Sequence, residues 1–146
     1  MSTTVGAHPV DDTLAANKAV VRAWFAALSA GHLDDAWALM DPAGDYWVLR
    51  QRVAMPVPQF ATVYGEHMEN TFVDGLQFTV GELTAEDDRV AAIAEGKAQL
   101  RRGAPYENLY HFLFVLRGGR IRHVREYADT YQSWRAFSAD APSGDG

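Results

Sequence analysis

One histidine and one glutamate, His111 and Glu126, stand on either side of a diglycine in the last third of the chain, and together they could exchange protons. Gly118–Gly119 separates two runs rich in β-branched and aromatic residues, which is a strong signal of a β-hairpin, because tight two-residue turns need positive φ at their centre. In the register set by that turn His111 faces Glu126, with the two Cβ atoms roughly 5 Å apart. We therefore predict an acid–base pair on the hairpin.

The same register surrounds this pair with apolar side chains. One hairpin face carries the pair together with Leu109, Leu113, Val115, Val124 and Ala128. The other face carries Tyr110, Phe112, Phe114 and Leu116 beside Ile121, His123, Arg125 and Tyr127. A three-residue bulged turn would slip the register by one, and Glu126 would then lose His111 as its partner. A surface or structural pair is the alternative interpretation.

Such a pair could carry out acid–base catalysis. Desolvation in an apolar hollow raises the pKa of a carboxyl group, and a neighbouring imidazolium opposes that rise. The two titrations would be coupled, so the pKa values would belong to the pair. We expect His111 to exchange the proton and Glu126 to orient the His111 ring or to favour its charged form, although the roles could be reversed.

Composition limits the classes to which the protein can belong. The chain has 146 residues, of which 48% are hydrophobic, as expected for one globular domain. A net charge of −6, with no basic run beyond Arg101–Arg102, argues against a nucleic-acid binder and predicts no nucleic-acid partner. The absence of cysteine excludes disulfides and thiolate chemistry. No signal-like or membrane-spanning run is evident, so a cytoplasmic location is expected.

The histidines give no case for a metal site. No pair has a spacing such as H-E-x-x-H, and His32 and His67 are expected to face solvent. The histidine spacing therefore predicts no metal site.

Helical spacing of apolar residues dominates the first half. A first helix is expected to begin at a cap on Asp11 or Asp12 and to end at Gly31. A short second helix should bury Leu33, Trp37 and Met40, and a third should run from Val57 to Phe72.

Strands dominate the second half. A brief strand is expected at 46–49, and longer strands at 76–83 and 90–100 lead to the hairpin. Thr130 is expected to cap a short terminal helix. The predicted organisation is a flexible arm at 1–10, one domain at 11–138 and a flexible tail at 139–146. The fold class is α+β, with a curved, cone-shaped antiparallel sheet packed against three N-terminal helices around a hollow suited to a ligand.

Two stretches carry a resemblance to a known superfamily. A-L-S-A-G-H-L-D-D-A-W-A-L-M-D-P at 27–42 and Y-E-N-L-Y-H-F-L-F-V-L-R-G-G-R-I-R-H-V-R-E-Y-A-D-T at 106–130 resemble the nuclear-transport-factor-2-like superfamily. Within it the chain looks most similar to SnoaL-like polyketide cyclases and to limonene epoxide hydrolase, over roughly residues 12–137. The resemblance implies a cone-shaped domain (a cystatin-like roll), usually a homodimer, with a pocket in the cone and no cofactor.

The resemblance also suggests roles for single residues. Trp24 occupies the position at which ketosteroid isomerases have a tyrosine. Val48 or Leu49 occupies the position of their catalytic base, an aspartate, so steroid isomerisation is disfavoured. In limonene epoxide hydrolase, R-D-Y-F-D supplies an aspartate base, and R-E-Y-A-D here places Glu126 at that position. Tyr46 matches its water-holding tyrosine, whereas Val48 replaces an asparagine. SnoaL-like cyclases use a hairpin His and Asp, which His111 and Glu126 resemble.

These inferences lead to one predicted function. We expect cofactor-free acid–base chemistry on an apolar polyketide-, terpenoid- or steroid-like molecule, of cyclase or isomerase type. An epoxide hydrolase and a non-catalytic binding or dimerisation module are the alternatives. The aromatic hairpin face, with Tyr110, Phe112, Phe114 and Tyr127, is expected to be the outer face and to be covered in a homodimer. The expected substrate-binding residues are Trp24, Tyr46, Val48, Tyr64, Leu109, Leu113 and Val124.

Overall fold

A computed structural model describes the backbone of residues 9–138 and the side chains of residues 12–138. The tail predicted at 139–146 and residues 1–8 of the predicted arm lie outside this part of the chain. The first helix begins at Pro9, ahead of the expected cap at Asp11 or Asp12. Proline is well tolerated in the first turn of a helix, where its missing N–H would have no partner.

The described chain forms four helices and six strands, which follow one another as a mainly helical half and a mainly β half. In chain order they are α1 (Pro9–Ala30), α2 (Leu33–Ala38), β1 (Met40–Val48), β2 (Val53–Pro56), α3 (Val57–Thr71), β3 (Gln77–Glu86), β4 (Arg89–Gln99), β5 (Pro105–Arg117), β6 (Arg120–Ala128) and α4 (Thr130–Phe137). The sequence prediction missed β2, and it placed the cap of the last helix one residue late. The side chain of Asp129 accepts hydrogen bonds from the backbone N–H groups of Tyr131 and Gln132.

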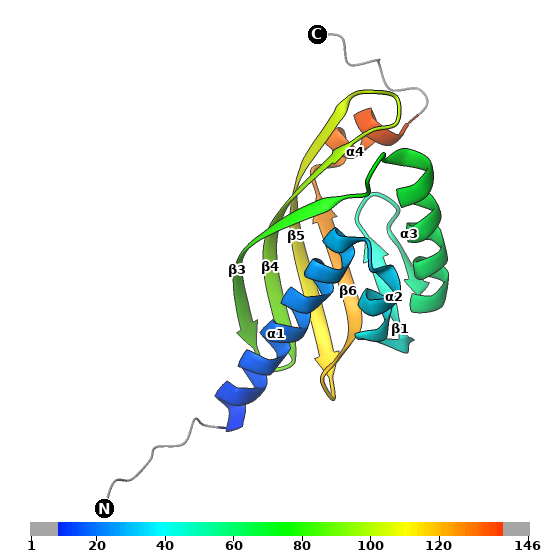
Figure 1. Cartoon of the computed structure of the whole chain (residues 1–146). Helices are drawn as coiled ribbons and strands as arrows, with labels where there is room; N and C mark the ends of the chain where they lie inside the picture. The colour runs from blue at the N-terminus through cyan, green and yellow to red at the C-terminus, as the bar shows by residue number, and fades with distance from the viewer. Residues whose placement is uncertain (1–8, 139–146) are drawn as a thin grey trace, which may run out of the picture.

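The six strands form one curved sheet in the order β2-β1-β6-β5-β4-β3 (Figure 1). All neighbouring pairs are antiparallel except β1 and β6, which are parallel. Helix α1 crosses one face of the sheet and α3 runs beside β1, so the helices cover the concave side (Figure 1). The predicted α+β architecture is confirmed. Of the helices in the described region, none is long and apolar enough to cross a membrane.

Aromatic side chains fill the space between α1 and the sheet. Trp24 and Phe25 of α1 meet Phe112 and Phe114 of β5 edge to face, with ring centroids 5.0 to 6.1 Å apart. Phe112 and Phe114 are fully buried, and Tyr110 is 7% exposed. The prediction that these three rings form an outer, partner-covered face is therefore wrong, because α1 packs on the face that carries them.

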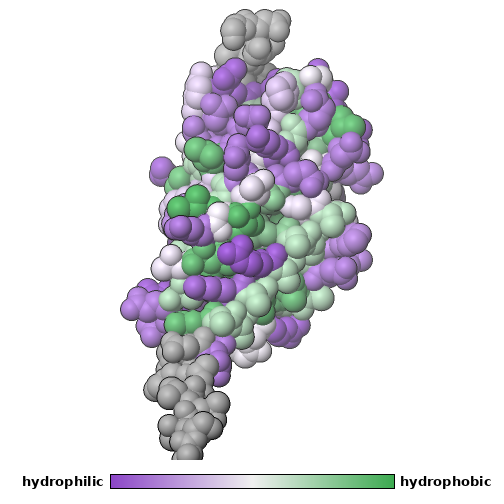
Figure 2. Space-filling model, turned by 60° about the vertical axis from the view of Figure 1, so that its left-hand side comes forward, coloured by the Kyte–Doolittle hydropathy of each residue, from purple (hydrophilic) through white to green (hydrophobic). Residues whose placement is uncertain are grey.

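The surface is divided between apolar and polar regions. One side of the molecule shows green, hydrophobic surface in its middle and lower part, while the end nearer the C-terminus is mostly purple and hydrophilic (Figure 2). Large apolar side chains remain exposed on the convex face of the sheet, including Ile93, Leu109 and Tyr127. Helices therefore cover only one face of this sheet.

The hairpin turn is the one that the diglycine predicts, but the register beyond it is not. Arg117 pairs with Arg120, and both Gly118 and Gly119 have positive φ, as a two-residue primed turn requires. Between Leu116 and Val115 the register then shifts by one residue, because Arg122 is inserted as a β-bulge.

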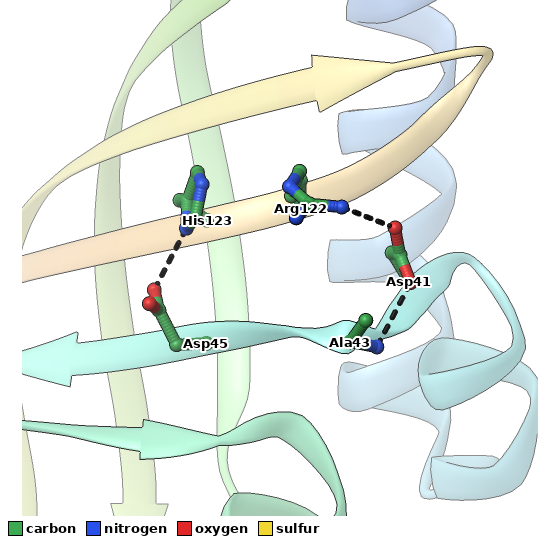
Figure 3. Close-up of polar contacts among 5 residues, drawn as sticks. All are labelled: Asp41, Ala43, Asp45, Arg122 and His123. Atoms are coloured by element: carbon green, nitrogen blue, oxygen red, sulfur yellow. Dashed lines mark hydrogen bonds and ion pairs between the residues drawn. The ribbon is translucent and has the colours of Figure 1, made fainter.

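Two neighbours on β1 hold this bulge in place. The Nη1 of Arg122 donates to Oδ2 of Asp41 at 2.9 Å, and the Ala43 N–H donates to the other oxygen of Asp41 (Figure 3). The hydrogen bond from that N–H is the largest cause that lowers the pKa of Asp41; burial opposes it, and the charge of Arg122 and its hydrogen bond lower the pKa further. Gly44 lies so close to the bulge that a Cβ there would collide with the backbone carbonyl of Arg122. The bulge thus needs both a charged anchor and a glycine.

Replacing Gly44 should disturb this contact. We expect Gly44→Ala to lower the free energy of unfolding by about 2 kcal/mol or more, because the new methyl group meets backbone atoms that cannot easily move. Denaturant unfolding monitored by tryptophan fluorescence would measure the loss. Gly65→Ala is the matched control, since nothing lies within 4 Å of a Cβ at that α3 position, and a gain of about 0.5–1 kcal/mol is expected. Equal stability of Gly44→Ala and the wild type would contradict this account of the bulge.

Candidate active site

A cavity of about 180 Å³ lies on the concave side of the sheet, enclosed by α3, α4 and the loop after β1. Its wall is mainly apolar, which suits a small, largely apolar guest. The apolar lining consists of Leu28, Val48, Leu49, Met55, Phe60, Val63, Met68, Phe72, Leu76, Phe78, Ala128 and Phe137. Polar side chains also line the cavity, and they determine what chemistry it can support.

Glu126 is the one carboxylate among the described residues that line the cavity. The Arg122 bulge pairs Glu126 with Phe112, so its side chain lies on the concave face. The hydroxyl of Tyr46 donates to Oε1 of Glu126 at 2.7 Å. Tyr46 is 1% exposed and stacks flat on Phe60, with ring centroids 3.6 Å apart. A fixed phenol thus orients the carboxyl group within an apolar wall.

The environment of Glu126 favours its protonated form. Burial raises the pKa of Glu126 to about 7 from its ordinary value of 4.5, and the hydrogen bond from Tyr46 opposes part of that rise. Burial, followed by the charge of Glu126 and the hydrogen bond to it, raises the pKa of Tyr46 well above its usual range. Tyr46 therefore stays protonated as a donor, while Glu126 can lose and regain a proton near neutral pH.

Tyr64 offers the cavity a free hydroxyl. In the described part of the chain its oxygen is one of two buried side-chain polar atoms without a hydrogen-bond partner, and Nε1 of Trp24 is the other. Tyr64 lies on α3, where its ring packs against Trp37 and Phe60. Burial and then the charge of Glu126 raise its pKa, so the hydroxyl remains a donor. An unpaired buried donor is costly unless a guest completes it.

A second polar group lies where β5 meets α4. The hydroxyls of Tyr106 and Tyr110 share a short hydrogen bond. The amide of Asn108 donates to the Tyr106 oxygen at 3.0 Å and to Oγ of Ser133 at 3.1 Å. Burial is the main cause that raises the pKa of both tyrosines. The cavity thus offers neutral phenols and one titrating carboxyl group.

His67 also lines the cavity, although the sequence analysis expected it to face solvent. Its Nδ1 lies 3.1 Å from Oγ1 of Thr71, and its ring packs edge to face on Phe137. Burial and then the charge of Arg50 lower the pKa of His67, so the ring is neutral near pH 7. It adds a hydrogen-bonding group near the mouth of the cavity.

His111 does not meet Glu126. The bulge pairs His111 with Tyr127, and both side chains lie on the convex face, with His111 exposed. The predicted catalytic pair is therefore wrong in its geometry, and the shift by one residue is the alternative that the sequence left open. His123, which was assigned to the other face from His111, shares its face, where Nδ1 lies 2.9 Å from Oδ1 of Asp45 (Figure 3).

The predicted substrate-binding residues are divided between the cavity and other places. Tyr46, Val48 and Tyr64 line the cavity. Leu109 and Leu113 lie with His111 on the convex face, and Leu109 is 68% exposed, so neither can touch a guest in the cavity. Trp24 and Val124 are buried on the concave side but are not part of the cavity lining. Both leucines were misplaced because the aromatic face of β5 was taken to be the outer face, whereas α1 packs on it.

Several cavity residues were not predicted to be functional. Tyr106, Tyr110, His67 and Phe60 needed the position of the helices over the sheet, which the sequence does not give. A signal for Tyr110 existed, because it alternates with Phe112 and Phe114 and would share their face. In the region that the structure describes, no group of three or more His, Asp or Glu side chains could hold a metal ion.

Comparison with known proteins places the chain in a family. Residues 21–124 match the model of the SnoaL-like domain. No curated protein matches the chain. Several solved structures share the fold. A putative SnoaL-like polyketide cyclase from Jannaschia sp. CCS1 is 20% identical, with a TM-score of 0.73 over 91% of this chain and 96% of that one.

Two further structures illustrate the range of this fold. An epoxide hydrolase from M. tuberculosis described as LEH-like is 16% identical, with a TM-score of 0.72 over 85% of this chain and 90% of that one. AclR, a putative hydroxylase from Streptomyces galilaeus, is also 16% identical, with a TM-score of 0.72 over 83% of each chain. At such identities the likeness shows the fold alone, so the chemistry must be argued from the cavity.

The raised pKa of Glu126 should be visible in the stability of the protein. The folded protein keeps this proton up to about pH 7, whereas the unfolded chain releases it near 4.5, so the folded state binds more protons in between. The free energy of unfolding therefore falls as pH rises through this window, by at most about 3 kcal/mol. The Glu126→Gln variant lacks this fall in stability. Its free energy of unfolding relative to wild type should therefore increase between pH 4.5 and 8.

Denaturant unfolding at a series of pH values would measure this difference. Glu66→Gln, which removes an exposed carboxylate on α3, is the control for the loss of a charge. A stability difference between Glu126→Gln and wild type that stays constant over the whole pH range would refute a raised pKa.

Proposed function

The chain belongs to the SnoaL-like domain family, and from this membership and the chemistry of its cavity we propose that it is an acid–base enzyme in which Glu126 moves a proton on a small, largely apolar molecule. The proposed substrate is polyketide-, terpenoid- or steroid-like, and the reaction is a cyclisation or an isomerisation. The observation that carries the proposal is the position of Glu126, whose carboxyl group lies in a mainly apolar cavity wall with Tyr46 as its hydrogen-bond donor, where burial raises its pKa to about 7. A general base works best when its pKa lies near the operating pH.

The arrangement suits removal of a proton from carbon next to a carbonyl group. Ionised Glu126 takes the proton, and the electron pair of the C–H bond moves to the carbonyl oxygen. The free hydroxyl of Tyr64 then donates to the developing oxyanion, which is stabilised in a site of low polarity. Tyr46 holds the carboxyl group in place throughout.

The second half of the reaction distinguishes the two types. In an isomerisation, protonated Glu126 returns its proton to a different carbon of the conjugated anion, and the carbonyl group forms again. In an aldol-type cyclisation, the enolate carbon attacks a second carbonyl carbon of the same molecule, and the new alkoxide takes the proton from Glu126. Both routes leave Glu126 ionised for the next turnover.

Epoxide opening is the second candidate, and the Glu126–Tyr46 pair is the observation that favours it. Ionised Glu126 would take a proton from water while that water attacks an epoxide carbon, and Tyr64 would donate a hydrogen bond to the epoxide oxygen as the C–O bond breaks. The resulting alkoxide would then take the proton from Glu126, which gives the diol and leaves Glu126 ionised. The likeness to an LEH-like epoxide hydrolase supports this candidate. Val48 lies in the cavity wall and offers a water molecule no hydrogen bond, which weakens it.

Two small probes separate these candidates. With cyclohex-3-enone in deuterated solvent, we expect the conjugated enone to form with deuterium at C4, the carbon that receives the proton, as measured by ultraviolet absorbance and NMR. Deuterium at the carbon next to the carbonyl group of the recovered substrate would report formation of the enolate alone. With limonene 1,2-epoxide, formation of the diol would indicate the hydrolase. Turnover by wild type should rise with pH through about 7, because Glu126 acts in its ionised form.

Variants test the role of Glu126 in this turnover. Glu126→Gln should lower kcat/KM by about 100-fold or more, since the amide cannot accept the proton. His111→Ala should leave it unchanged, because His111 lies on the convex face. Equal turnover by Glu126→Gln and wild type would refute the mechanism. Tight binding of these probes without any turnover would favour the non-catalytic binding module.

We further propose that the protein is a homodimer joined through the convex sheet face. Ile93 is 59% exposed and Leu109 68%, and they lie on this face with Tyr127. Such a patch commonly marks an interface, and a two-fold dimer would cover it twice. Light scattering at micromolar concentration should give twice the chain mass for wild type and the chain mass for Leu109→Arg. A monomeric wild type would rule out the dimer.

A further inference from the structure

An arginine cluster lies beside the mouth of the cavity, formed by Arg50, Arg101 and Arg102. We propose that the guest in the cavity carries an oxyanion, a carboxylate or a phosphate, that binds to this cluster while the apolar body occupies the cavity. This inference rests on the proposed function, because it assigns a substrate class to the same site. It predicts an amphipathic acid as the substrate.

The arginine cluster and the cavity adjoin. An open depression beside the cavity contains all three arginines, together with Asn70 and Thr71. The depression shares Arg50, His67 and Phe137 with the cavity wall. A guest long enough to leave the cavity at Phe137 would therefore meet the cluster directly.

The three guanidinium groups are held in place by neutral partners. Nε of Arg101 donates to the backbone carbonyl of Glu69 at 2.6 Å, and Nη2 of Arg102 donates to that of Arg135 at 3.0 Å. The guanidinium carbon of Arg50 lies 5.6 Å from the centre of the Phe137 ring. These contacts fix the positions of the charges without neutralising them.

No carboxylate forms an ion pair with these arginines within the described chain. None of the described Asp or Glu residues lines the depression. The cluster is thus locally basic in a chain whose net charge is −6. Oxyanions suit such a cluster, since arginine offers several N–H donors in a planar fork that matches carboxylate and phosphate.

The field of the cluster extends to the cavity and would orient a guest. Arg50 helps to lower the pKa of His67, after the larger effect of burial, so its charge acts on a group in the cavity wall. At the other end, ionised Glu126 would repel an anion. An acid with an apolar body would therefore bind with its anionic end outward at the arginines and its body beside Glu126.

Binding measurements on the full chain test this with matched probes. The probes are 4-cyclohexylbutanoate, the neutral 4-cyclohexylbutanol and 4-cyclohexylbutyl phosphate, each titrated by calorimetry at low and high salt. We expect the carboxylate or the phosphate to bind at least about tenfold more tightly than the alcohol at low salt, and this preference to shrink as salt screens the charges. The stronger of the two anions identifies the oxyanion.

Variants locate the preference on the cluster. Arg50→Gln should lower the affinity for the preferred anion by about tenfold and leave the alcohol unchanged, whereas Arg50→Lys should retain most of the preference. Arg117→Gln removes the same charge at the tip of the β5–β6 hairpin, at the opposite end of the molecule, and should have no effect (Figure 1).

Several outcomes would overturn the inference. Equal binding of the anions and the alcohol would do so and would leave the proposed enzyme intact. Equal losses of anion affinity in Arg50→Gln and Arg117→Gln would show that the net charge of the protein, and not the arginine cluster, causes the preference. Binding of no probe would refute both the inference and the cavity as a ligand site. Conversely, a clear anion preference together with full turnover by Glu126→Gln would support the inference and reject the proposed mechanism.

Discussion

The contact between β1 and the bulge at Arg122 determines which residues of β6 face the cavity. Asp41 holds the Arg122 side chain, and Gly44 leaves room for the Arg122 carbonyl group. Because side chains alternate along a strand, one inserted residue moves every later side chain of β6 to the opposite face. Glu126 thereby turns toward the concave side, and His111 is left on the convex side with Tyr127.

The bulge thus places the carboxyl group of Glu126 where its ionisation destabilises the folded protein. Burial of Glu126 costs stability once the group is ionised, and natural proteins tolerate such a cost mainly where function needs it. Around it lie Tyr46, Tyr64, Tyr106 and Tyr110, whose pKa values burial raises, so each stays a neutral hydrogen-bond donor. One titrating acid among neutral phenols can exchange a proton and stabilise an oxyanion in the same cavity.

Much of the fold could be predicted from the sequence, because its signals are local. Helical spacing gave α1 and α3, alternation gave β3 and β4, and the diglycine gave the turn of the β5–β6 hairpin. The short strand β2 was missed because the segment Val53–Pro56 has no alternating sequence pattern of its own. It is a strand because it pairs with β1.

The candidate site was only partly predictable, for a different reason. Glu126, Tyr46, Val48 and Tyr64 were selected and line the cavity, whereas His111, Leu109 and Leu113 were assigned to the wrong face. The face of β5 was misjudged because the position of α1 over Phe112 and Phe114 was not known. The pairing of His111 with Glu126 fails for a separate reason, the insertion of Arg122, which depends on Asp41 and Gly44 in a distant strand that pairs in parallel with β6. Hairpin rules describe two strands, and here the third strand determines the register.

A titration of the glutamate side-chain carboxyl carbons by NMR would test the central claim most directly. Comparison of wild type with Glu126→Gln identifies the signal of Glu126. The account predicts one carboxyl signal that titrates near pH 7 in wild type and is absent from the variant. A Glu126 signal that titrates near 4.5, as in a carboxyl group surrounded by water, would place the side chain outside the apolar cavity and contradict the account.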